Sequence, residues 1–165
     1  MGEPRVFVFR AETDQGERDY ITLLPPEITT QYGVPAAAIV GTLALPLNAN
    51  EPISPDHFEA NPAFGNFLHE VLGREMPKQT GVQAEAQRVI NGWVYLIDQR
   101  TPTPDGSVPA VDVLGKIQVK DGYAAAGSYV RNPHHRLLSD NGFFQLEIGL
   151  HQCLVDALAE LARSS

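Results

Sequence analysis

Cysteine is scarce in this sequence, and its scarcity excludes several kinds of cross-linked or metal-bound domain. Cys153 is the only cysteine among 165 residues, so no disulfide can form within the chain. Structural zinc sites built from several cysteines are excluded for the same reason. The histidines show no HxH or HExxH spacing, and the adjacent pair His134 and His135 would point apart on an extended chain. We therefore expect no metal ion, no cofactor and, because a lone thiol suits a reducing compartment, a cytoplasmic protein.

Positive charge and long apolar runs are in short supply as well. Lys and Arg number 12 against 20 Asp and Glu, which gives a net charge of −8 and an isoelectric point near 5.0. No cluster of basic residues offsets the repulsion between this charge and phosphate backbones, so we expect no nucleic-acid partner. No apolar stretch approaches the length of about 20 residues that a membrane helix needs, and the first residues lack the pattern of an export signal. We expect neither membrane insertion nor secretion.

Complete motifs for nucleotide binding and for serine hydrolysis are missing too. The glycines form neither GxGxxG nor a phosphate-binding GxxxxGKS/T, and no serine lies in a GxSxG context. Cys153 falls on the apolar stripe of the expected C-terminal helix, where a thiol usually acts as a small buried hydrophobic group. The sequence therefore contains no complete catalytic motif.

The chain does carry a hydrophobic fraction of 43%, which suffices for a core at this length. No polar or Pro/Gly-rich stretch is long enough to act as a flexible linker, so we expect one globular domain over residues 1–165. Alternating and β-branched patterns predict strands over residues 6–9, 20–23, 39–45, 93–97, 113–119 and 123–130. The Asp121-Gly122 pair predicts a tight turn between the last two.

Helices are predicted where a capping side chain precedes a proline or where an apolar stripe has helical spacing. A short helix that starts at Pro25-Pro26-Glu27 should turn Ile28 and Tyr32 inward and end at Gly33. Ser54 and Asn61 each predict a helix start. A long stripe predicts the C-terminal helix over 144–162, and segment 82–89 fits either a helix or a strand.

This order of elements lacks a regular strand, helix, strand alternation. It favours the α+β class, with an antiparallel or mixed sheet of about five to six strands. We expect the helices mainly on one face, with the C-terminal helix covering the sheet.

The densest polar cluster follows the predicted strand over 123–130. His134 and His135 can carry protons near neutral pH, and the Arg136 guanidinium suits planar anions. A structural interpretation is more common for such a cluster. In it Asn132-Pro133 makes the turn, one histidine bonds a main-chain carbonyl, and Arg136 pairs with a surface carboxylate.

A second cluster, Asp98 and Arg100, follows the aromatic strand over 93–97. If it faces a pocket, Asp98 would orient His134 or His135 as a base, and Arg100 or Arg136 would hold a carboxylate or phosphate. A simple ion pair is the more common outcome for two such residues at a strand end. The candidate ligand-binding residues are therefore Asp98, Arg100, His134, His135 and Arg136.

Two further features have a structural and a functional interpretation. Trp93 and Tyr95 alternate on one strand face, and such aromatics form core more often than a ligand floor. The prolines over 101–109 make a stiff connection, although the same stiffness would suit a lid or a docking surface.

The sequence favours a non-catalytic ligand-binding or protein-interaction module, with self-association as a homodimer and a small anionic ligand as expected partners. The alternative is a small enzyme that uses His134 or His135 as acid or base and Arg100 or Arg136 to hold an anionic substrate. An acidic inhibitor of a basic enzyme is a third interpretation, supported by net charge alone.

Overall fold

The computed structural model describes residues 6–14, 16–43, 53–100 and 108–165, and it confirms the α+β class. The described residues form four α-helices and ten strands, and the strands pair antiparallel. The chain divides into two compact units, residues 1–67 with 155–165, and residues 68–154. The boundary falls inside α2 (Pro62–Glu75) and inside α4 (Ile148–Ser164). A single domain over 1–165 stays a prediction.

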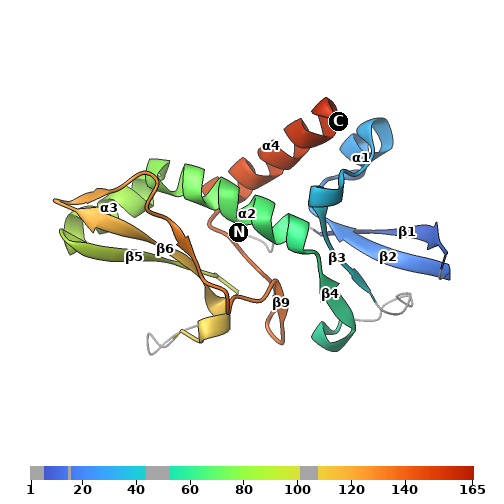
Figure 1. The fold of residues 1–165 in the computed structure, drawn as a ribbon, viewed down its shortest axis with the longest axis horizontal. Helices are drawn as coiled ribbons and strands as arrows, with labels where there is room; N and C mark the ends of the chain where they lie inside the picture. The colour runs from blue at the N-terminus through green and yellow to red at the C-terminus, as the bar shows by residue number, and fades with distance from the viewer. Residues whose placement is uncertain (1–5, 15, 44–52, 101–107) are drawn as a thin grey trace. The chain divides into compact units, whose positions relative to one another are not determined.

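The first unit holds a four-stranded sheet in the order β1-β2-β3-β4 (Figure 1, blue to teal). Its strands are β1 (Phe7–Thr13), β2 (Gly16–Thr22), β3 (Ile39–Leu43) and β4 (Phe58–Ala60). The strands predicted over 6–9 and 20–23 form an antiparallel hairpin, in which β1 pairs with β2 from Phe7 opposite Thr22 to Thr13 opposite Gly16. β2 and β3 contribute three buried apolar side chains to the core: Ile21, Val40 and Leu43.

The short helix α1 (Pro26–Tyr32) forms where its prolines predict it, but its orientation differs from our expectation. Gly33 follows it at a φ of 81°, a value that glycine adopts without strain. No residue of the described helix is fully buried, and Tyr32 is 39% exposed. The prediction that Ile28 and Tyr32 face inward is therefore wrong for Tyr32, while Ile28 is half-buried. Spacing of four residues defines a shared face, but it does not determine how much of that face the rest of the protein covers.

Helix α2 begins at the cap that the sequence predicts. The Asn61 side-chain oxygen accepts the main-chain N–H of Ala63 at 3.2 Å, which satisfies one of the free donors of the first turn. The apolar stripe is buried at Phe64, Leu68, Val71 and Leu72. The other predicted start is weaker, because Ser54 caps only a single 3₁₀ turn, Pro55–His57.

The second unit holds a four-stranded sheet in which β6 lies beside three strands. β5 (Gly92–Ile97) pairs with β6 (Val113–Lys120), and β6 pairs with both β7 (Tyr123–Ala124) and β8 (Val130–Arg131). Asp121 and Gly122 join β6 to β7 with positive φ values of 51° and 82°, so the predicted tight turn is confirmed. Segment 82–89 belongs to α3 (Thr80–Val89), which packs against β5, β6 and β7. The short hairpin of β9 (Leu138–Ser139) and β10 (Gly142–Phe143) completes the strands.

The expected sheet of five to six strands is a wrong prediction, because the strands divide between two four-stranded sheets and a two-stranded hairpin. Apart from β6 with β8, the strands pair with their neighbours in sequence, and the helical segment from Pro62 to Val89 separates the first group from the second. The C-terminal helix begins at Ile148, later than expected, after buried Phe144 and Leu146 in extended chain. Among the described residues, no helix combines the length and apolar character required to span a bilayer. Of the proline-rich connection over 101–109, residues 101–107 lie outside the described residues.

Candidate functional site

Asp98 and Arg100 follow β5 directly, and both are buried although they are charged. Asp98 is 1% exposed and Arg100 is 7% exposed. The main chain here is fixed on two sides, because the Asp98 N–H donates to the Asp112 carbonyl at 2.7 Å and the Gln99 N–H donates to the Gln145 carbonyl at 2.9 Å. The two side chains therefore turn into the second unit instead of facing solvent.

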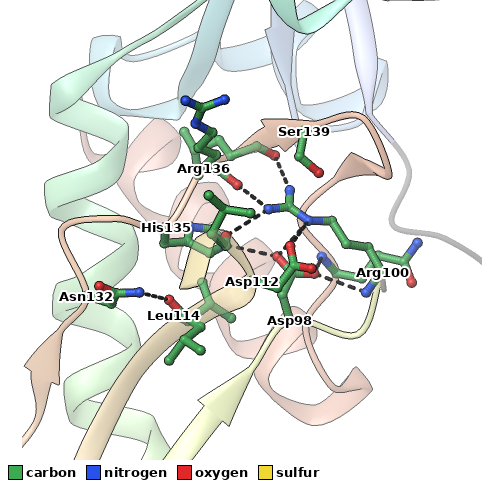
Figure 2. Close-up of polar contacts among 12 residues, drawn as sticks. Asp98, Arg100, Asp112, Leu114, Asn132, His135, Arg136 and Ser139 are labelled. Carbon is green, nitrogen blue, oxygen red and sulfur yellow. Dashed lines mark hydrogen bonds and ion pairs between the residues drawn. The ribbon is translucent and has the colours of Figure 1, made fainter. Parts of the chain in front are cut away.

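Every hydrogen-bond donor of the Arg100 guanidinium is occupied by an acceptor of the protein (Figure 2). Its Nε donates to Asp112 Oδ1 at 2.9 Å. Its four remaining N–H groups donate to main-chain carbonyl oxygens at 2.6 to 3.2 Å, those of Leu137, Gly142, Val111 and Arg136. A guanidinium has five donors, so none is left for an anionic substrate. Arg100 therefore holds together three segments of the chain, at residues 111–112, 136–137 and 142.

Asp98 completes this cluster by binding His135. Asp98 Oδ2 lies 2.9 Å from His135 Nε2 and 3.5 Å from Arg100 Nε. Its Oδ1 accepts the main-chain N–H groups of Arg100 at 3.1 Å and of Gln145 at 2.8 Å. The His135 side chain is only 3% exposed. The contact between Asp98 and a histidine that the sequence suggested is present, but it is enclosed by protein.

The other two candidate residues lie outside this buried cluster of Asp98, Arg100, Asp112 and His135. His134 is exposed, and its main-chain N–H donates to the Asn132 side chain at 3.1 Å. Arg136 takes part only through its carbonyl, and Figure 2 shows its guanidinium pointing away from the cluster. The ligand-binding role of the five residues stays a prediction, and the contacts give three of them a structural role.

Sequence reasoning missed Asp112, the second carboxylate of the cluster. Asp112 is fully buried and bonds Arg100 at 2.9 Å. Its signal was an acidic residue between Val111 and Val113, in a run that otherwise reads as apolar. A carboxylate in such a position requires a partner, because an unpaired buried charge is very costly.

A second buried pair was also missed. His69 on α2 lies with its Nδ1 2.8 Å from the Tyr129 hydroxyl, and the two rings stack. Burial, together with the charges of Arg131 and His135, lowers the pKa of His69 to about 4. Burial also raises the pKa of Tyr129, so the pair is neutral at physiological pH. The sequence held one indication of this packing, the glycine at residue 115 within a strand. A side chain there would collide with the Tyr129 ring.

The outer face of the second sheet contradicts our expectation for its aromatics. Trp93 is 37% exposed and Tyr95 is 55% exposed, so the prediction that they form core is wrong. Alternation correctly placed them on one face, but the buried face of β5 is the other one, which carries Val94 and Leu96.

A row of side chains crosses this outer face. Tyr95 on β5 lies opposite Lys116 on β6, and Lys116 lies opposite Val130 on β8. Directly opposed residues of antiparallel strands share a face, so the three form one row. The Lys116 ammonium lies 4.4 Å from the centre of the Trp93 ring, a cation–π contact. A pocket of about 370 Å³ opens beside this row. Its lining comes from Tyr95, Ala110, Val113, Gly115, Lys116, Val130, Arg131, Asn132 and Pro133.

The described part of the chain contains no group of three or more His, Cys, Asp or Glu side chains placed to hold a metal ion. Cys153 is half-buried, not fully buried, and its Sγ lies 3.7 Å from Glu75 Oε1. Comparison with protein-family models, with curated proteins and with solved structures finds no match for this chain.

Proposed function

We propose that this chain is a non-catalytic ligand-binding module whose ligand binds on the outer face of β5, β6 and β8. The observation that carries the proposal is the row of Tyr95, Lys116 and Val130 beside a pocket of about 370 Å³. Pockets that bind small molecules are concave, mostly apolar, and contain a few polar groups that orient the ligand. Exposed aromatic side chains next to such a pocket favour binding over a purely structural role.

The state of the buried cluster supports a non-catalytic role. A general base must reach the proton that it removes, and an anion-binding arginine must have donors to offer. His135 is enclosed with its Nε2 against Asp98, and Arg100 has no donor to spare. The alternative of a small enzyme that uses His134 or His135 with Arg100 or Arg136 therefore has less support.

A fragment screen followed by NMR tests the proposal. Nitrogen-labelled protein is titrated with neutral, cationic and anionic fragments, and the shifts of its amide signals locate each binder. We expect the largest shifts at Tyr95, Lys116 and Val130. Binders that shift His134 to Arg136 instead, or turnover of any fragment, would count against the proposal.

A matched pair of variants adds specificity to this test. Tyr95→Ala removes an aromatic wall of the pocket, whereas Tyr123→Ala removes an aromatic ring that is 70% exposed on β7 and does not line it. We expect only the first to weaken fragment binding. Equal losses in both variants would indicate non-specific contact with exposed aromatics.

Self-association as a homodimer and a cytoplasmic location stay predictions of the sequence. Light scattering decides the first, since a homodimer must have twice the mass of the 18.0 kDa chain.

A further inference from the structure

We infer that the pocket beside Tyr95, Lys116 and Val130 takes a small monoanion with an aromatic body, an aromatic carboxylate, and that Lys116 binds its charged group. This inference rests on the proposed function and goes beyond it, because it names the class of ligand. Its evidence is the size of the pocket, the charge of its lining and the position of the Lys116 ammonium.

The size and walls of the pocket fit one small molecule with an apolar body. A volume of about 370 Å³ lies near the lower end of the range of small-molecule sites. Its walls include the apolar side chains of Ala110, Val113, Val130 and Pro133. The Tyr95 ring forms one side and is 55% exposed, so a flat ligand can lie against it.

The pocket lining includes a cation, Lys116, although the whole chain is acidic. Its described lining residues include two cations, Lys116 and Arg131, and no carboxylate. The positive charge of Arg131 also acts on nearby groups, where it contributes to lowering the pKa of His69. A local cation attracts an anionic ligand, whereas the net charge of −8 on the chain repels a polyanion such as a nucleoside triphosphate. The combination favours a ligand with one negative charge.

Lys116 is placed to bind an anion. Its side chain lines the pocket, and its Nζ lies 4.4 Å from the centre of the Trp93 ring, which is not itself part of the lining. Among the residues that the structure describes, no carbonyl or carboxylate oxygen is a hydrogen-bond partner of Nζ. An ammonium has three donors, and a carboxylate can accept from it without displacing a hydrogen-bond partner.

Trp93 gives the test a reporter beside the pocket, because its ring contacts the Lys116 ammonium. It is the only tryptophan in the chain, so nitrogen-labelled protein shows a single indole N–H signal. Cinnamate, an aromatic carboxylate, is titrated while this signal is followed. Cinnamamide, which has the same shape without the charge, and inorganic phosphate, which has charge without the apolar body, are titrated in parallel.

The variants separate the charge of Lys116 from the stability of the strand. Lys116→Met removes the ammonium and keeps an unbranched side chain. Lys120→Met is its matched control, because Lys120 is exposed on the same strand and does not line the pocket. A charge-assisted hydrogen bond predicts about a tenfold or greater loss of cinnamate affinity in Lys116→Met, with no change in Lys120→Met.

The outcomes distinguish this inference from the proposed function. Cinnamate binding at Trp93 that exceeds cinnamamide binding and depends on Lys116 supports the inference. Equal affinity for cinnamate and cinnamamide, or an unchanged Lys116→Met variant, overturns it and leaves a neutral ligand for the proposed site. Phosphate binding as strong as that of cinnamate overturns the aromatic part. If neither organic probe shifts the Trp93 signal, the inference is overturned. The fragment screen then tests the proposed function independently.

Discussion

Two regions along β5 differ in which kinds of side chain they bury and which they expose. At the end of the strand, Asp98 and Arg100 are charged and buried, whereas along its outer face Trp93 and Tyr95 are aromatic and exposed. Charged residues usually lie in water and large aromatics usually lie in the core, so both regions depart from the common pattern. The departure has a different cause in each region.

The buried cluster is accounted for completely by contacts within the protein. Arg100 bonds one carboxylate and four carbonyls, and Asp98 bonds two main-chain N–H groups and His135. The exposed aromatic face has few such contacts, apart from that between Lys116 and Trp93. A side chain whose bonding capacity is filled inside the protein maintains structure, and a surface whose capacity is unfilled is available to a ligand.

Removing the Arg100 guanidinium is expected to have the largest effect on stability. In Arg100→Met, Asp98 and Asp112 remain buried without their cation, and four carbonyls lose their donors. Breaking a buried ion pair from one side costs about 3–5 kcal/mol, a large share of the stability of a domain. Chemical denaturation measures the loss.

Arg136→Met is the control for that variant. The Arg136 side chain is exposed, and its carbonyl, which Arg100 uses, is kept in the variant. A change within about 0.5 kcal/mol is expected. If both variants lost the same stability, the buried cluster would not be the cause.

The pH dependence of stability should reveal the buried His69. Its folded pKa of about 4 lies below its ordinary value of 6.5, so in acid the unfolded chain binds a proton that the folded protein excludes. The stability that the neutral, buried His69 contributes is fully present above about pH 6.5 and is lost as the pH falls toward 4. Each unit of pKa corresponds to about 1.4 kcal/mol, so the loss is on the order of 3 kcal/mol.

His69→Gln isolates this effect from the titration of carboxylates. Glutamine can still bond the Tyr129 hydroxyl but does not titrate. Unfolding free energies of the two proteins are compared at a series of pH values. As the pH falls from 6.5 to 4, the free energy of unfolding should decrease less in the variant than in the unchanged protein. Parallel curves would contradict the prediction.

Local features of the fold could be predicted from the sequence, and its long-range pairing could not. The Asn61 cap of α2 and the Asp121-Gly122 turn depend on chemistry within a few residues, so both were predicted. The division into two sheets depends on which strands meet, and alternation carries no such information. Segment 80–89 forms α3 through packing against β5, β6 and β7, which its own composition does not specify.

The candidate site shows the same limit. Charge and position selected Asp98, Arg100 and His135, and these three do meet. Their burial was not predictable, because the acceptors of Arg100 are mostly main-chain carbonyls, which any residue type supplies. The exposure of Trp93 and Tyr95 was missed for a related reason, since alternation defines two faces but not which one the core covers.

Gly115→Ala tests how closely the Tyr129 ring packs against β6. A methyl group at residue 115 would collide with the Tyr129 ring, and overpacking of this kind costs about 1–3 kcal/mol. Gly81→Ala on α3 is the control, because no atom lies within 4 Å of the added methyl group, and alanine in a helix should stabilise by up to about 1 kcal/mol. Thermal unfolding should therefore show shifts of opposite sign. Equal shifts would mean that the Tyr129 contact does not limit residue 115.

Tyr95→Ala is expected to have the smallest effect on stability and the clearest effect on binding. Tyr95 is 55% exposed, so its removal should change the free energy of unfolding by less than about 1 kcal/mol. The same variant should lose affinity for the fragments that bind the pocket, because one wall is gone. Arg100→Met, measured below its unfolding midpoint, should keep that affinity. Tyr95→Ala that destabilises as strongly as Arg100→Met would show that the aromatic face, like the buried cluster, serves the fold.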